Sequence, residues 1–185
     1  MPLDKIRLYD ESATAYHRRY RLIQRVKYQV LVPYLREGPL VDVGVGTGIG
    51  LPTLTRFRPI VGIDGSIEML RIAQNSVAAG KTGSTDVSLI CSEATSLPLR
   101  TGCFSTVLSV TVLQNLSDVR QGVRELVRAA RPGGLLGITV LEKSLSLEQI
   151  EAYTAGSAKL VERLTDLAHE DSGLILRRSA GVPQT

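Results

Sequence analysis

The stretch LVDVGVGTGIG, residues 40–50, decides the fold of this 185-residue chain. Its aliphatic start predicts a short strand at 40–44, which runs into the alternate glycines Gly44, Gly46 and Gly48. A strand that leads through a glycine turn into a helix exposes backbone amides at the carboxyl edge of a parallel sheet. Open α/β sheets bind their ligands at that edge. The stretch therefore predicts an α/β fold with a ligand site at this glycine turn.

Outward from the turn, strands and helices alternate along the chain. The alternation predicts parallel βαβ units with right-handed crossovers. We expect a single doubly wound, Rossmann-like open sheet that is mostly parallel and has helices on both faces. The predicted strands after the first are 60–64, 86–90, 105–110 and 135–141, and the predicted helices are about 48–56, 66–79 and 118–130.

The N-terminal part of the sequence predicts a helical lid or arm over residues 1–38. Apolar residues recur at helical spacing over 12–36, Pro33 breaks or bends this helix, and the ligand-binding domain follows at 39–178. The first 40 residues hold 8 Lys and Arg against 4 Asp and Glu, which accounts for the net charge of +4. A basic arm attracts anionic partners such as RNA, and a solvated helix face is the alternative interpretation.

The C-terminal part predicts a shortened edge of the sheet. Ser146 and Gln149 are spaced as a capping box for one helix over 146–170, which Gly173 ends. Residues 173–178, GLILRR, then provide a single edge strand, and 179–185 are expected to be a disordered tail. Because an uncovered edge invites strand pairing, we expect a homodimer or a small activating partner there.

Composition limits the other possibilities. Cys91 and Cys103 have neither the number nor the spacing of a disulfide framework or a metal site, and we interpret both as buried thiols. No apolar run is long enough to span a membrane, and the first residues lack the apolar core of a signal peptide. We therefore expect a cytoplasmic protein without a metal.

The turn also restricts the ligand. The dinucleotide fingerprint would require a glycine where Ile49 or Leu51 stands, and the sequence contains no phosphate-binding P-loop. Asp64 ends the second predicted strand beside the turn, where a carboxylate can accept hydrogen bonds from both hydroxyls of a ribose. Its alternative role is to cap the helix that begins near Ser66, although Ser66 is the better cap. The two features together predict a nucleoside ligand.

Four segments resemble the class I S-adenosylmethionine-dependent methyltransferases, in the branch that includes the ubiquinone and menaquinone enzymes. They are LVDVGVGTG at 40–48, GIDGSIEML at 62–70, CSEATSLPLRTGCFSTVLSVTVLQNL at 91–116 and ELVRAARPGGLLGI at 125–138. The resemblance covers about two thirds of the chain. It implies S-adenosyl-L-methionine as the cofactor and a methyl acceptor that the sequence leaves unnamed.

The resemblance also implies where the cofactor binds. Asp42 and the three glycines of the turn would hold the methionyl end, Asp64 the ribose, and Glu93 and Ala94 the adenine. Glu93 replaces the usual aspartate, and FST at 104–106 replaces the usual FD. The full set of expected cofactor-binding residues is Asp42, Gly44, Gly46, Gly48, Asp64, Gly65, Ile67, Glu93, Ala94 and Ser109.

A dedicated catalytic base is optional, because the sulfonium leaving group needs no protonation and positioning alone accelerates the transfer. Tyr16, His17 and Gln114 are the weak catalytic candidates, and an amide such as that of Gln114 cannot act as a base. Tyr9, Tyr16 and Tyr20 are candidates for shaping the acceptor pocket, or else pack as ordinary helix aromatics.

The sequence leaves three functions open. The first is methyl transfer to a small molecule, and the second is methylation of RNA or the translation apparatus through the basic arm. The third is binding of S-adenosylmethionine without catalysis, because the FST segment and the missing base depart from the resemblance.

Overall fold

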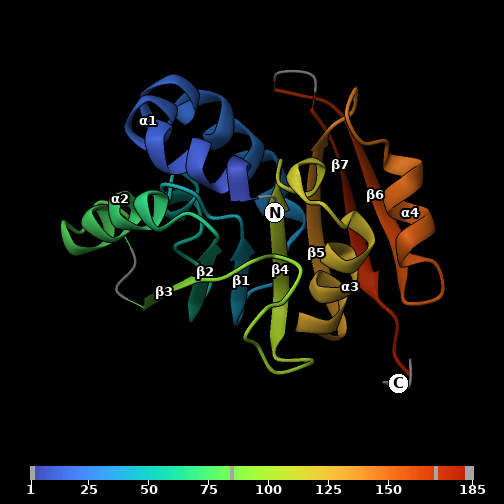
Figure 1. Ribbon diagram of the computed structural model, residues 1–185. Helices are drawn as coiled ribbons and strands as arrows, with labels where there is room; N and C mark the ends of the chain where they lie inside the picture. Colours follow the sequence, from blue (N-terminus) through green and yellow to red (C-terminus); the bar gives the residue numbers. More distant parts are fainter. Residues whose placement is uncertain (1–2, 84–85, 169–170, 182–185) are drawn as a thin grey trace.

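The computed structural model describes residues 3–83, 86–168 and 171–181, and a seven-stranded sheet forms the centre of this described part (Figure 1). The strand order is β3-β2-β1-β4-β5-β7-β6. The first five strands in this order run parallel, and β7 and β6 are antiparallel to their neighbours. The strands are β1 Leu40–Val43, β2 Ile60–Asp64, β3 Val87–Cys91, β4 Phe104–Val110, β5 Ala130–Leu141, β6 Ala158–Leu167 and β7 Asp171–Arg178. This architecture confirms the predicted doubly wound α/β fold.

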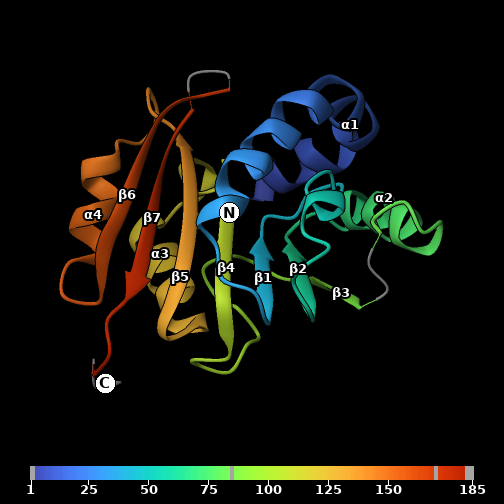
Figure 2. The same ribbon diagram turned by 180° about the vertical axis from the view of Figure 1, so that it is seen from behind.

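Helices cover both faces of the sheet, and α1 also lies over the carboxyl ends of the central strands (Figures 1 and 2). Two apolar clusters form the core, one packed with α1 and α2 and the other with α3 and α4. Alternate residues of β1 supply both clusters, since Leu40 belongs to the first and Val41 to the second. The helices are α1 Leu3–Leu31, α2 Ile67–Ala78, α3 Val119–Ala129 and α4 Leu147–Thr154, with 3₁₀ turns η1 Val32–Tyr34, η2 Leu51–Thr53 and η3 Leu113–Asn115.

The predicted helix at 48–56 is wrong. The chain forms only the short 3₁₀ turn η2 there, which contains Pro52. Tyr28 of α1 packs so closely that a Cβ added at Gly50 would lie 2.3 Å from its ring. Pro52 lacks the backbone N–H that the interior of a regular helix would use, which favours the short turn.

The predicted single helix at 146–170 is also wrong. The capping box of Ser146 and Gln149 is confirmed, but it starts the short helix α4, and the chain turns near Gly156 into β6. Irregularities in the pairing of β6 with β7 break the two-residue alternation of a strand, so that its apolar residues recur at nearly helical spacing. The hairpin of β6 and β7 completes the sheet, so the prediction of a shortened edge is wrong, and GLILRR lies in an inner strand.

Three further predictions are corrected or limited by the structure. Cys91 and Cys103 are exposed rather than buried, because both lie at ends of strands. Helix α1 begins at Leu3, well before residue 12, and gives way to a 3₁₀ turn that contains Pro33. Of the predicted disordered tail, residues 182–185 lie outside the described part of the chain.

Candidate functional site

A cavity, with about 660 Å³ of open space that includes its mouth, lies at the carboxyl ends of β1, β2 and β4, beneath α1. The glycine turn and the ends of these strands form its floor, and Tyr9 and Tyr16 of α1 contribute from above. Its walls combine backbone, apolar side chains and a few polar groups. The lining residues are Tyr9, Tyr16, Val43, Gly44, Gly46, Ile63, Asp64, Gly65, Met69, Ser92, Glu93, Ala94, Val110, Thr111, Val112, Asn115 and Leu116.

The glycine turn has the backbone shape that only glycine adopts readily. Gly44, Gly46 and Gly48 have φ angles of 85°, 54° and 74°. A Cβ at Gly44 would lie 2.1 Å from a methyl group of Val112, whereas a Cβ at Gly46 would have no atom within 4 Å. Gly46 therefore presents bare backbone to open space at the cavity, where a ligand can approach the main chain.

Asp64 links this turn to α2. Its Oδ2 accepts a hydrogen bond from the backbone N–H of Gly46 at 2.9 Å, and its Oδ1 accepts one from the backbone N–H of Ser66 at 2.9 Å. Burial raises the pKa of Asp64, although these two donors oppose the shift. Each carboxylate oxygen retains acceptor capacity beyond these bonds. The side chain is therefore fixed at the cavity wall with lone pairs available to hydroxyl donors.

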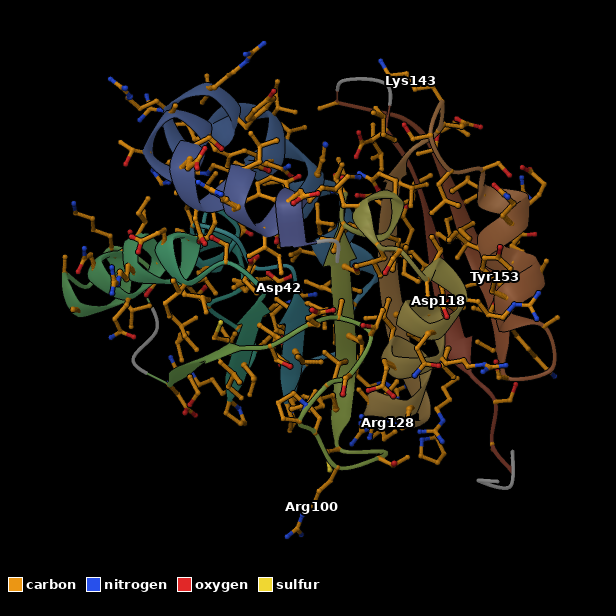
Figure 3. All side chains as sticks on the ribbon, in the orientation of Figure 1. Asp42, Arg100, Asp118, Arg128, Lys143 and Tyr153 are labelled. Atoms are coloured by element: carbon orange, nitrogen blue, oxygen red, sulfur yellow. The ribbon has the colours of Figure 1, made fainter. Side chains whose placement is uncertain are left out.

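Asp42 lies behind the turn, at the end of the sheet beneath α1 (Figure 3). Its Oδ2 accepts a hydrogen bond of 2.7 Å from the hydroxyl of Tyr28, and its Oδ1 has no partner among the described residues. Burial raises the pKa of Asp42 to about 7. This carboxyl is completely buried, and Asp42 is not among the residues that line the cavity.

A smaller hollow of about 280 Å³ adjoins the cavity and shares Tyr16, Gly44 and Gly46 with it. Gln24 also lines this hollow, and its buried Oε1 has no partner in the described chain. Two unpaired buried acceptors, on Gln24 and Asp42, thus lie near the glycine turn. Unpaired buried acceptors are costly, so the site suits a ligand that carries an N–H donor such as an ammonium group. Gln24, which lines the hollow, therefore fits the methionyl end of S-adenosylmethionine, whereas the buried carboxyl of Asp42 lines neither space.

The structure brings six of the ten expected cofactor-binding residues to the cavity wall: Gly44, Gly46, Asp64, Gly65, Glu93 and Ala94. It places the other four elsewhere. Gly48 packs against Leu51 and Ala73, Ile67 opens α2 with a side chain on the surface, and Ser109 is wholly buried within β4. The remaining one is Asp42, described above.

Of the three catalytic candidates, only Tyr16 lines the cavity. Its hydroxyl accepts a hydrogen bond from Gln24 Nε2, and burial raises its pKa to about 12, so it is a neutral phenol at ordinary pH. His17 lies within 2.9 Å of Thr47 Oγ1, and Gln114 donates to the backbone carbonyl of Thr111. Neither of these two side chains reaches the cavity.

Aromatic and amide side chains hold α1 over the cavity. The rings of Tyr9 and Tyr16 meet edge to face with centroids 6.1 Å apart, and Tyr16 and Tyr20 are 4.8 Å apart. Asn115 donates a hydrogen bond to the hydroxyl of Tyr9, so η3 and α1 are joined across the opening. Asp10 further ties α1 to α2 by accepting from the backbone N–H of Glu68.

Thr111 is a lining residue that sequence reasoning missed. It alone among the described non-glycine residues has a positive φ, of 61°, and no sequence pattern indicated this conformation. Its Oγ1 lies 2.6 Å from Asp171 Oδ2 and 3.0 Å from Lys27 Nζ. Lys27 and Asp171 form a buried ion pair of 2.8 Å. This network joins α1, β7 and the cavity wall.

Within the described ranges, no group of three or more potential ligands could hold a metal ion. The same residues contain no helix that is long and apolar enough to cross a membrane.

The chain is similar to known proteins in the region that forms this site. A family model described as a methyltransferase domain matches residues 41–138. A demethylmenaquinone methyltransferase of Corynebacterium urealyticum is 33% identical over 100 residues, which cover 54% of this chain and 40% of that protein. The chain spans about half the length of the curated relatives it matches.

Two solved structures show the same fold. A methyltransferase in complex with the Trm112 methyltransferase activator, from Haloferax volcanii, gives a TM-score of 0.78 at 17% identity and covers 93% of this chain and 98% of its own. An S-adenosylmethionine-dependent methyltransferase from Aquifex aeolicus gives a TM-score of 0.74 at 23% identity, with 96% and 99% covered. At these identities, the likeness concerns the fold.

Proposed function

The chain belongs to the methyltransferase domain family, among the class I S-adenosylmethionine-dependent enzymes, and on this premise we propose that it methylates a small-molecule acceptor in the cavity beneath α1. The observation that carries the proposal is the junction of Gly46 and Asp64. Bare backbone and a fixed carboxylate meet there at one cavity wall. Such a junction suits a nucleoside whose ribose hydroxyls donate to the acid.

We propose a role for each part of the site in holding the cofactor. Asp64 accepts from the ribose hydroxyls, and Glu93 and Ala94 face the adenine. The unpaired oxygens of Asp42 and Gln24 support a place for the methionyl ammonium group beside the turn. Three expected residues would affect cofactor binding without touching the cofactor. They would do so by shaping the turn (Gly48), the start of α2 (Ile67) and β4 (Ser109).

When bound, S-adenosylmethionine supplies an electrophilic methyl group on a positively charged sulfur. The protein contributes positioning and exclusion of water, which together can lower the barrier by roughly 7 to 11 kcal/mol. Tyr9 and Tyr16 cover the cavity, and burial raises the pKa of both phenols. These neutral hydroxyls can orient an acceptor, and they do not act as bases at neutral pH.

An apolar small molecule is the acceptor class that the walls favour. Away from the polar glycine turn, several aliphatic side chains line the cavity beside a few polar ones. The curated relatives that act on demethylmenaquinone support an acceptor of this class. The lining residues that carry this argument are Val110, Val112 and Leu116.

We also propose a protein partner at the outer edge of the sheet. Strand β6 forms that edge, and its Leu160 and Val161 are 47% and 44% exposed. A neighbour of the same fold forms a complex with a methyltransferase activator, which supports a small activating partner. A second copy of this chain is the other candidate, because the edge strand is open to pairing. A monodisperse monomer by light scattering at high concentration would contradict the dimer.

Transfer of a labelled methyl group tests the proposed activity. The chain is incubated with methyl-tritiated S-adenosylmethionine and either demethylated quinones and phenols or bulk RNA. We expect label in the organic extract of the small-molecule arm. Label only in RNA would favour an RNA methyltransferase, and cofactor binding by calorimetry without transfer to any acceptor would favour a non-catalytic binding protein.

A further inference from the structure

A second hollow, with about 1000 Å³ of open space, lies between α1, the residues that follow the glycine turn and the loop after α2. Four basic or imidazole side chains line it, namely His17, Arg21, Arg25 and Lys81, and we call it the basic groove. Ile49 and Pro52 form part of its floor, just beyond the glycine turn. The groove is separate from the cavity and was not identified by the sequence.

Helical spacing gathers three of these side chains on one face. His17, Arg21 and Arg25 follow one another at four-residue intervals, so they lie in a row along α1. Each interval advances about 6 Å along the helix axis. Lys81 belongs to the loop after α2 and lines the opposite side of the groove. Tyr16 points into the cavity instead, so α1 separates the two sites.

Among the residues that the structure describes, the charges in the groove have no acidic counterion. None of the residues that line it is acidic. Within the described part of the chain, Arg21, Arg25 and Lys81 make no ion pair, unlike Arg7, Arg71, Arg128 and Arg163. Burial and the charge of Arg21 lower the pKa of His17. Arg21, Arg25 and Lys81 are exposed cations that line one groove, so a bound anion would reduce their mutual repulsion.

We propose that the basic groove binds phosphate groups of an anionic ligand. Guanidinium groups donate paired hydrogen bonds to phosphate oxygens, and the row of Arg21 and Arg25 allows two such contacts along an extended ligand. Lys81 adds a third charge from the opposite side. No Phe, Tyr or Trp side chain lines the groove, so recognition depends mainly on phosphate charge rather than on stacking with bases. The inference does not depend on methyl transfer.

Two probes test the groove and identify the source of the phosphate. Inorganic pyrophosphate is titrated by calorimetry, and a fluorescent 12-nucleotide RNA is titrated by anisotropy at several salt concentrations. We expect the variant with Arg21→Gln, Arg25→Gln and Lys81→Gln to lose at least tenfold in affinity for the probe that binds. For RNA, its salt dependence should fall by about 2 in log–log slope, because three phosphate contacts are lost.

A variant of equal charge serves as control. Arg100→Gln, Arg131→Gln and Arg177→Gln remove three exposed charges outside the groove, and Figure 3 shows Arg100 at the end of the molecule opposite α1. We expect this control to bind like the parent chain. Binding of pyrophosphate alone would assign the groove to a small phosphorylated ligand, and binding of RNA alone would assign it to a nucleic acid backbone. Absence of binding to both probes, or equal loss in the two triple variants, would overturn the proposal.

Discussion

The backbone N–H of Gly46 donates to Asp64 Oδ2 across 2.9 Å, so the glycine turn after β1 is joined to the end of β2 at the cavity wall. The same carboxylate accepts from the backbone N–H of Ser66, the residue that caps α2. The glycine turn, the end of β2 and the start of α2 therefore together fix the side chain of Asp64. Because its position is set by backbone donors, substitution of Asp64 affects a ligand more directly than substitution of a mobile surface acid.

Asp64→Ala should weaken S-adenosylmethionine binding by about 1 to 3 kcal/mol, because it removes hydrogen bonds to a charged acceptor. Isothermal titration calorimetry measures the change. Asp86→Ala, at an exposed acid before β3, is the control and should bind normally. An unchanged dissociation constant in Asp64→Ala would remove the ribose role from this residue.

Gly46→Ala should abolish or strongly weaken cofactor binding with only modest loss of stability. The added methyl group enters open space at the cavity, and the positive φ of the backbone costs roughly 1 to 2 kcal/mol. Gly80→Ala is a matched control, since Gly80 also has a positive φ and an added Cβ there meets no atom within 4 Å. Thermal unfolding should shift equally in both variants, and calorimetry should distinguish them. Equal cofactor affinity in the two would contradict this account of the turn.

Lys27→Met should destabilise the fold by about 3 to 5 kcal/mol, because it leaves the carboxylate of Asp171 buried without its partner. The two side chains are 3% and 1% exposed, and their charged atoms lie 2.8 Å apart. Urea unfolding measures the loss. The double variant with Asp171→Leu should recover much of it, and a double variant no more stable than Lys27→Met would show that the pair is not the cause.

Stability should fall as pH rises from about 4 to about 7, through Asp42. Burial raises the pKa of this carboxyl to about 7 in the folded chain, whereas an unfolded aspartate has a pKa of about 3.9. Over this range the folded state holds a proton that the unfolded state has lost, so the free energy of unfolding decreases with pH and levels off above the folded pKa. Asp42→Asn should remove this contribution, which urea unfolding at a series of pH values can measure. If the free energy of unfolding of Asp42→Asn changed with pH in the same way as that of the parent chain, Asp42 would not be the source of this pH dependence.

The sequence predicted the sheet well in segments whose apolar residues follow the spacing of a single kind of secondary structure. The stretch around β1, the acid at the end of β2 and the capping box of Ser146 correspond to local rules, and the structure contains all of these elements. It could not predict β6, because pairing irregularities there produce a spacing close to that of a helix. Nor could it predict that Tyr28 would pack directly against Gly50, where a 3₁₀ turn stands instead of the predicted helix.

At the site, the acids and glycines were identifiable because their chemistry and spacing are local. The roles of Lys27 and Thr111 were not, because each depends on a partner far away in sequence. Thr111, for example, has a left-handed backbone, and its hydroxyl donates a hydrogen bond to Asp171, 60 residues away. The basic groove likewise forms only when α1 is placed beside the loop after α2.

A crystal structure of the chain with S-adenosylhomocysteine tests the central claim most directly. We predict density in the cavity beneath α1, with the ribose hydroxyls within hydrogen-bonding distance of Asp64, the adenine beside Glu93 and Ala94, and the amino group near Gln24. A ligand bound outside this cavity, or a cavity without density when calorimetry shows saturation, would contradict the account.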